Sequence, residues 1–208
     1  MKILALELSS QRGSIVWREN DQAVFVRFFA NDRKHSGAFF ENAREASRQF
    51  GPPDAIVVGL GPGSYAGVRI AIATAIGLRT ATRAKLCGIP SICAIDTEAR
   101  IYSVIGDARR ESFFLGRVKE GRMVEEPSLY SKEDLTRRLT ELAEPVYVSE
   151  ALPQFPVAAL AFPSARRLAE LAREQIDGMP EAQSLEPIYL REPFITVPKT
   201  PLLSAMRR

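Results

Sequence analysis

Three short apolar runs, separated by polar turns, open the chain. They occupy residues 3–8, 14–18 and 23–29, and only a few residues connect each run to the next. Runs of this length, rich in Ile, Val and Phe and joined by short turns, are typical of β-hairpins. The pattern therefore predicts three consecutive antiparallel strands.

The apolar spacing becomes helical after residue 36. From there apolar residues recur mostly every three or four positions until Gly51-Pro52-Pro53, a sequence that stops a helix. The spacing predicts a helix over residues 37–50, a strand over 55–58, a helix from 64 to about 83 and a last strand over 89–95. This order of elements, β-β-β-α-β-α-β, is that of a ribonuclease H-like or actin-like lobe, an analogy at the level of the fold.

The second half has a weaker pattern, interrupted by prolines. It predicts strands over residues 101–105, 112–118 and 146–149 and helices over 132–142 and 164–176. We therefore expect two units. The first is an actin-like lobe over residues 1–95, and the second is a smaller α/β lobe over residues 96–208 with an extended tail from residue 193.

Composition fits an ordinary globular protein. The 208 residues are 46% hydrophobic and 25% charged, which is enough to bury one core or two small ones. The first strand meets Glu7 too early for a signal peptide, so we expect a cytoplasmic protein with no membrane segment. The net charge of +3 permits proximity to nucleic acid without indicating it. Cys87 and Cys93 lack metal-ligand spacing and are expected in the core.

The most specific segment is the glycine-rich stretch from Gly59 to Gly67, between a predicted strand and a predicted helix. Its glycines allow positive φ and a close approach of another chain or a ligand, and the helix start is able to bind an anion. Pro62 stiffens the turn and Ser64 is placed to cap the helix. We expect a structural turn built from Gly61, Pro62, Gly63, Ser64 and Gly67.

Two common phosphate-binding motifs fit this turn poorly. A P-loop requires Lys and then Ser or Thr after its last glycine, but Val68 and Arg69 follow Gly67. The dinucleotide spacing Gly-x-Gly-x-x-Gly is also missed. A generic phosphate site and a plain strand-to-helix turn both stay open.

Catalytic alternatives lack partners in the sequence. The chain has one histidine, His35, and Phe39 stands four residues later, so no His-x-x-x-His metal site is formed. His35 is best interpreted as the entry to the following helix. Ser64 lacks the Gly-x-Ser-x-Gly elbow of serine hydrolases, because Ala66 stands at the second glycine position. We expect no metal and no cofactor.

The helix after Gly67 is apolar on two sides. At 100° per residue, Val68, Ala71, Ile72 and Ala75 share one side, and Ile70, Ala73, Gly77 and Ala81 share roughly the opposite side. One stripe must pack on its own sheet. The other needs cover from the helix over residues 37–50 or from a second chain.

Four segments together resemble the TsaB (YeaZ) family over nearly the whole chain. They are Ile3-Leu4-Ala5-Leu6-Glu7-Leu8-Ser9-Ser10, Gly61-Pro62-Gly63-Ser64-Tyr65-Ala66-Gly67-Val68-Arg69, Asp107-Ala108-Arg109 and Glu186-Pro187-Ile188-Tyr189-Leu190-Arg191. The resemblance implies a two-lobed actin-like (ribonuclease H-like, ASKHA) α/β fold. It also implies a partner in making N6-threonylcarbamoyladenosine at position 37 of ANN-decoding tRNAs.

Two departures from the family concern nucleotide binding. Glu7-Leu8 stands where the family usually has Asp-Thr, and Tyr65-Ala66 stands where it has Phe-Thr. In actin-like nucleotide binders the early carboxylate helps to place a metal on phosphate. A longer acid followed by a residue without a hydroxyl makes a self-contained ATP site less expected.

The resemblance implies a non-catalytic scaffold that binds the related enzyme TsaD, helps to recruit TsaE and contacts tRNA only indirectly. It places the partner surface, with homodimer formation as a second use, on the helix after the glycine turn. The expected interface residues are Tyr65, Val68, Arg69, Ile72, Ala75 and Ile76. Of the two stripes, the one with Val68, Ile72 and Ala75 is expected to face the partner. The alternatives are a stand-alone actin-like ATPase and a peptidase-like hydrolase.

Overall fold

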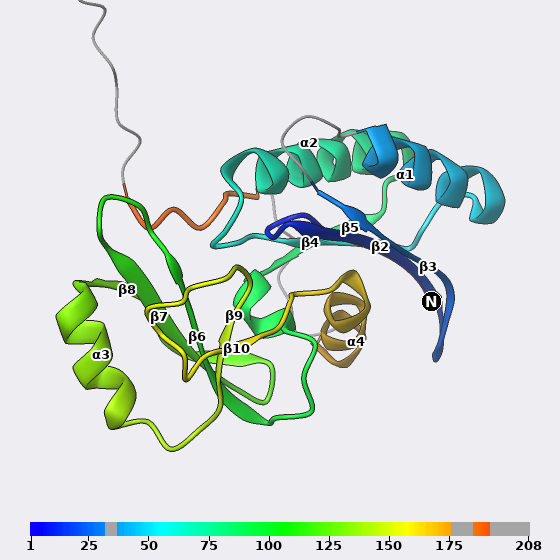
Figure 1. Ribbon diagram of the computed structural model, residues 1–208. Helices are drawn as coiled ribbons and strands as arrows, with labels where there is room; N and C mark the ends of the chain where they lie inside the picture. The colour runs from blue at the N-terminus through cyan, green and yellow to red at the C-terminus, as the bar shows by residue number, and fades with distance from the viewer. Residues whose placement is uncertain (32–36, 176–184, 192–208) are drawn as a thin grey trace, which may run out of the picture.

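The computed structural model describes residues 1–31, 37–175 and 185–191, and it contains two five-stranded sheets (Figure 1). The first sheet has the order β3-β2-β1-β4-β5. Its strands are β1 (Lys2–Glu7), β2 (Arg12–Glu19), β3 (Gln22–Ala30), β4 (Ala55–Gly59) and β5 (Lys85–Ile89). Strands β1 to β3 pair antiparallel, as predicted, and β4 and β5 continue the sheet in parallel with β1.

Helices cover both faces of this first sheet (Figure 1). Helices α1 (Gly37–Phe50) and α2 (Tyr65–Thr82) pack on one face, and α4 (Ala165–Gln175) packs on the other. Successive side chains of a strand point to opposite faces, so Leu4 and Leu6 join the core under α1 and α2 while Ile3 and Ala5 join the core under α4. A strand covered on both faces has apolar residues on both, which explains the unbroken apolar run from Ile3 to Leu6 in β1.

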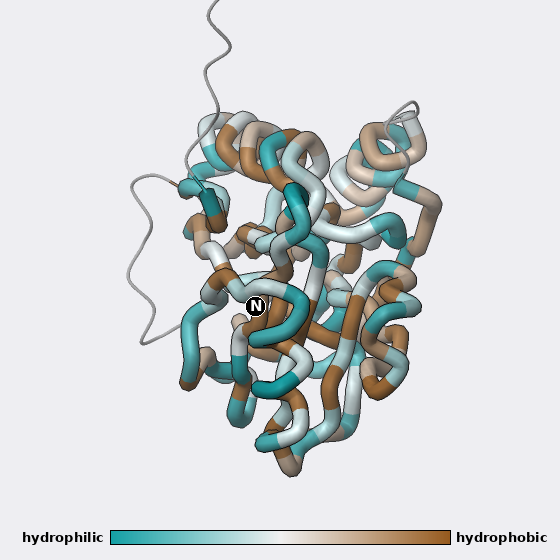
Figure 2. Tube along the Cα trace, turned by 60° about the vertical axis from the view of Figure 1, so that its left-hand side comes forward, coloured by the Kyte–Doolittle hydropathy of each residue, from teal (hydrophilic) through white to brown (hydrophobic). Residues whose placement is uncertain are grey.

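The second sheet has the order β10-β9-β6-β7-β8. Its strands are β6 (Ile101–Asp107), β7 (Phe113–Lys119), β8 (Arg122–Tyr130), β9 (Val146–Val148) and β10 (Ala159–Leu160). One face contributes Val104 and Phe114 to the core shared with α4, and the other is covered by α3 (Lys132–Thr140) through Leu135 and Leu139. Figure 2 shows hydrophobic residues along the strands and hydrophilic residues in many of the connecting turns.

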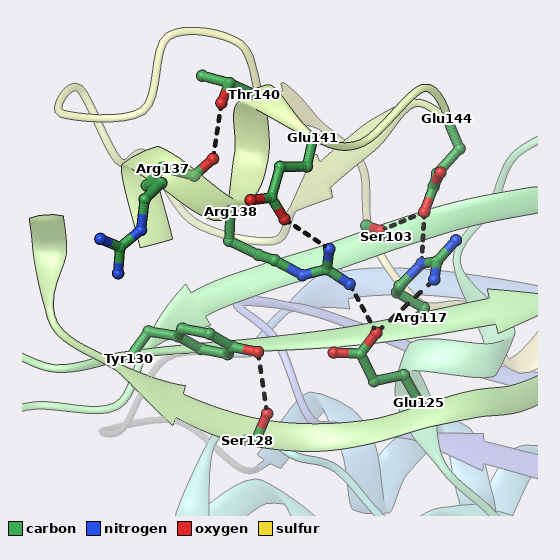
Figure 3. A network of polar contacts seen from close by, with 10 residues as sticks. All are labelled: Ser103, Arg117, Glu125, Ser128, Tyr130, Arg137, Arg138, Thr140, Glu141 and Glu144. Carbon is green, nitrogen blue, oxygen red and sulfur yellow. Dashed lines mark hydrogen bonds and ion pairs between the residues drawn. The ribbon is translucent and has the colours of Figure 1, made fainter. Parts of the chain in front are cut away.

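A network of charged side chains joins α3 and the residues after it to the second sheet (Figure 3). The Arg117 Nε donates to Glu144 Oε1 at 2.6 Å, and the Ser103 hydroxyl donates to the same oxygen at 2.9 Å. Arg138 on α3 donates to Glu125 on β8 at 3.3 Å. Burial acts to raise the pKa of Glu144, but the hydrogen bonds from Arg117 and Ser103 outweigh it and hold that pKa below its ordinary value.

Most predicted elements are confirmed, and three strands differ. The helix over residues 37–50 has the predicted bounds. The strand predicted over residues 89–95 is wrong, because β5 ends at Ile89 and a short 3-10 helix, η1 (Ser91–Ala94), follows. Pro90 explains the difference, since it has no N–H to donate to a neighbouring strand. Strands β8 and β10 were not predicted.

The fold is the two-lobed actin-like α/β fold that the order of elements and the resemblance predicted. Helix α4 follows the second sheet in sequence yet packs on β1, β2 and β4 of the first. The division of the chain at residue 95 stays a prediction. The predicted tail from residue 193 lies outside the described residues. No helix within the described ranges combines the length and the apolar character that crossing a membrane requires.

Candidate functional site

The glycine-rich turn connects the end of β4 to α2 and adopts the predicted capped form. Ser64 is the N-cap of α2, and its hydroxyl oxygen accepts from the Gly67 N–H at 3.3 Å. Gly61 has φ of +84°, a conformation that side chains with a Cβ rarely adopt. The turn therefore needs both a glycine at 61 and a capping residue at 64.

The close approach that the glycines permit is made by the same chain. A Cβ added to Gly63 would lie 2.1 Å from the Ser9 carbonyl oxygen, and one added to Gly67 would lie 2.1 Å from that of Leu8. Both distances are far below van der Waals contact, and both clashing atoms belong to the backbone. The turn after β1 thus lies directly against the start of α2.

Several amides of the glycine turn donate within the chain. Leu60 N–H donates to the Ile89 carbonyl at 2.9 Å, and Gly61 N–H donates to the Ser91 hydroxyl at 2.9 Å. Ser64 N–H donates to the Ser9 carbonyl at 2.6 Å. A phosphate-binding loop presents such amides to its ligand. Their internal use favours the strand-to-helix turn over the generic phosphate site.

Glu7 occupies the position of the early carboxylate and is fully buried. Its Oε1 accepts from the Ser9 N–H at 2.6 Å, and a Cβ added to Gly59 would lie 1.9 Å from its Oε2. Burial raises the pKa of Glu7, and the hydrogen bonds from Ser9 only partly oppose this effect. Glycine at 59 therefore leaves the space that the longer acid fills.

A cavity of about 740 Å³ lies between the glycine turn and the second sheet. All four segments that carry the family resemblance contribute to its wall, through residues such as Ser10, Ser64, Asp107, Arg109, Tyr189 and Arg191. On the second lobe, the Asp107 carboxylate accepts from the Arg109 backbone N–H at 2.6 Å and from its guanidinium at 2.8 Å. Segments far apart in the sequence thus meet at one interlobe cleft.

Helix α2 buries the stripe that was expected to face a partner. Val68, Ile72 and Ala75 lie in the core between α2 and the first sheet, and each is at most 6% exposed. Placing them on the partner side was wrong. The sheet lies on that side, because β1, β4 and β5 are the strands that contact α2.

Small apolar residues run along the outer face of α2. Ala66, Ala73 and Gly77 are exposed along it, and a Cβ added to Gly77 would meet nothing within 4 Å. Three of the predicted interface residues also lie on this face, since Tyr65, Arg69 and Ile76 are exposed. We call Ala66, Ala73 and Gly77, with these three, the outer face of α2.

Other candidate residues have no site around them. Cys87 and Cys93 are buried in the core, as expected. His35 lies outside the described residues. Within the described residues, no group of three or more His, Cys, Asp or Glu side chains is placed to hold a metal ion.

Sequence reasoning missed the path of residues 185–191. Ile188 N–H donates to the carbonyl oxygen of Leu60 at 2.8 Å, and the Tyr189 ring lies beside Tyr65, with ring centroids 5.7 Å apart. The signal was the segment from Glu186 to Arg191, which belongs to the resemblance but has no clear helical or strand periodicity. The segment closes the cleft beside the glycine turn.

Comparisons with known proteins agree with this architecture. The sequence model of the family described as TsaD, tRNA N6-adenosine threonylcarbamoyltransferase, matches residues 33–145. A solved Pseudomonas aeruginosa protein, described as similar to peptidase YeaZ, is 25% identical with a TM-score of 0.74, covering 91% of this chain and 99% of its own. A structure described as YeaZ from the same organism is 24% identical, with the same coverage and a TM-score of 0.71.

An uncharacterized protein of Mycobacterium leprae is 30% identical over 144 residues, which are 67% of this chain and 38% of that protein. The chain thus spans little more than a third of the length of this relative. The fold and the cleft define the class of two-lobed actin-like proteins. Within it, the chain belongs to the TsaB (YeaZ) family, inside the wider TsaD family that the sequence model describes.

Proposed function

We propose that this chain is a non-catalytic partner subunit that binds a TsaD-type enzyme through the outer face of α2. The observation that carries the proposal is the row of exposed Ala66, Ala73 and Gly77, bordered by Tyr65 and Ile76. Small residues let the backbones of two helices approach closely, and exposed apolar surface is stabilised when a partner covers it. A second copy of the chain would use the same face when the enzyme is absent.

The interior of the first lobe also favours a non-catalytic subunit over a nucleotide-binding enzyme. Glu7 is enclosed rather than open to the cleft, and amides of the glycine turn donate to the chain itself. Both features are used for structure where a stand-alone actin-like ATPase would use them for nucleotide. The partner would act by binding the competent conformation of the enzyme more tightly than other conformations, and so raise its population. Recruitment of TsaE and contact with tRNA would follow through the complex.

Reconstitution tests this proposal. TsaD, TsaE, threonylcarbamoyl-adenylate and substrate tRNA are combined with and without the chain, and modified adenosine is measured. We expect modification to depend on the chain, and the chain alone to have no modifying or peptidase activity. The Ala73→Glu variant is tested in parallel, because it alters the outer face of α2 without touching the cleft. It is expected not to replace the parent chain in the reaction. Full modification in the absence of the chain would refute the proposal.

Nucleotide binding separates the scaffold from the ATPase alternative. Calorimetry with Mg-ATP and the isolated chain is expected to show weak or no binding. A micromolar or tighter dissociation constant, about −8 kcal/mol or more favourable, would instead support a nucleotide-binding protein. Glu7→Ala is then expected to change activity of the complex only modestly.

A further inference from the structure

Residues 185–191 cross the glycine turn and are anchored there at two points. Leu185 is buried in the core of the first lobe, and its side chain fills the space above Gly88, where an added Cβ would lie 2.9 Å from it. Three residues later, the Ile188 N–H donates to the Leu60 carbonyl oxygen. In Figure 1 this segment, in orange, lies beside the start of α2. Its position is therefore fixed relative to that helix.

The anchored segment places Tyr189 on the surface next to α2. Tyr189 is 45% exposed and Tyr65 is 56% exposed, although their rings lie in contact. The Arg69 guanidinium lies 4.8 Å from the Tyr65 ring centroid and also donates to the Tyr65 hydroxyl. We call Tyr65, Arg69 and Tyr189 the Tyr-Tyr-Arg cluster.

The chemistry of this cluster is that of a protein contact. Tyr and Arg are enriched among the residues that dominate binding energy at protein interfaces. The two rings offer apolar area with few rotatable bonds, and the guanidinium offers donors that suit a carboxylate. Because both rings are already held, little conformational entropy is lost when a partner covers them.

We propose that Tyr189 is a direct contact of the TsaD-type subunit, so that the partner surface combines the outer face of α2 with the segment 185–191. This inference rests on the proposed function, because it extends the same surface. The occupant is the enzyme subunit of the proposed function, since Tyr65 and Arg69 lie on the outer face of α2 and the Tyr189 ring is packed against Tyr65. The partner would place an apolar or aromatic group on the two rings and a carboxylate near Arg69.

The test compares three variants of the full chain titrated with purified TsaD. Tyr189→Ala is expected to lower affinity at least tenfold without changing the melting temperature, because the side chain is exposed. Tyr189→Phe keeps the ring and is expected to stay within about threefold of the parent. Leu160→Ala is the matched control, since Leu160 is 56% exposed on β10 of the other lobe and is expected to change nothing.

A crosslinking arm and the Ala73→Glu variant separate the outcomes. A photoreactive benzoylphenylalanine at position 189 is expected to crosslink to TsaD, and one at position 160 is not. If Ala73→Glu abolishes binding while Tyr189→Ala binds normally and position 189 fails to crosslink, the inference is overturned and the proposed function stands. If Ala73→Glu also binds normally, both the inference and the proposed function are overturned. Crosslinks between copies of the chain alone would assign this cluster to a homodimer and contradict the proposal.

Discussion

Helix α2 covers the first sheet and α3 covers the second, but their outer faces differ in kind. Each buries an apolar stripe against its sheet, with Ile72 in α2 and Leu135 in α3 as examples. The outer face of α3 carries charged and polar residues, among them Arg137 and Thr136. The outer face of α2 instead carries a row of Ala and Gly, bordered by Tyr65, Arg69 and Ile76.

The difference supports the proposal that the outer face of α2 is a partner surface and that of α3 is a solvated one. Every side of α3 has a physical explanation within this chain, because its inner side meets leucines and the ionic network and its outer side meets water. The inner side of α2 is explained in the same way. Its outer side is not, since an exposed row of small apolar residues gains nothing from water.

The largest effect is expected from Ile72→Glu, which tests the inner side of α2. An unpaired carboxylate at this buried position is expected to cost more than about 4 kcal/mol and to unfold or aggregate the chain. Circular dichroism and denaturant titration measure it. Ala73→Glu, one residue away on the exposed side, is the control and should stay folded. A folded Ile72→Glu variant would show that the inner side has been assigned wrongly.

A smaller loss is expected from Arg117→Ala, which breaks the ionic network under α3. Glu144, whose side chain is only 11% exposed in the parent, then loses its shortest charged partner, so we expect a loss of about 1–3 kcal/mol. Arg137→Ala is the control, because its pair with Asp134 is exposed and contributes less than about 0.5 kcal/mol. Equal effects of the two variants in urea unfolding would contradict the role of the network.

The pH dependence of the second lobe follows from Glu144. Its pKa is lower in the folded chain than the ordinary value of 4.5, so its contribution to stability is present above pH 4.5 and is lost as pH falls through the folded pKa. The stability difference between the parent and Glu144→Gln should therefore be largest near pH 7 and shrink in acid. Unfolding curves at several pH values measure it, and a constant difference would count against the ion pair.

The first lobe should show the opposite sign at Glu7. Its pKa is raised by burial, so its unfavourable contribution appears as pH rises from 4.5 through the folded pKa. Glu7→Gln is isosteric and keeps an oxygen that accepts from the Ser9 N–H. We expect this variant to be slightly more stable than the parent at pH 7 and similar at pH 4. A destabilised variant at pH 7 would mean that the charged form is required.

Much of the first lobe could be predicted from the sequence, because its elements have strong local signals. The helix over residues 37–50 is bounded by Gly51-Pro52-Pro53, and Ser64 has the position of a cap. Strand β5 was placed too late because the residues from Ile89 to Ile95 are nearly all apolar, although Pro90 ends the pairing. Strand β8 was missed because it is an edge strand with Glu125, Glu126 and Pro127 in it.

The orientation of α2 and the residues that line the cleft could not be predicted from the sequence, because both depend on tertiary contacts that the periodicity of apolar residues does not reveal. Both stripes of α2 are apolar, so the pattern alone gives no reason to put Ile72 rather than Ala73 on the sheet. Burial in the folded chain decides between them, since Val68, Ile72 and Ala75 lie inside while Ala73 and Gly77 are exposed. The packing of Tyr189 beside Tyr65 joins positions more than a hundred residues apart. Only the folded chain brings them together.

The most direct test of the central claim is light scattering of TsaD mixed with the Ala73→Glu variant or with Thr136→Glu, its counterpart on α3. Both substitutions place a new carboxylate on the exposed face of a helix, and both variants should be folded by circular dichroism. If the outer face of α2 is the docking surface, Thr136→Glu forms the complex like the parent and Ala73→Glu does not. Complex formation by Ala73→Glu at the affinity of the parent would contradict the claim.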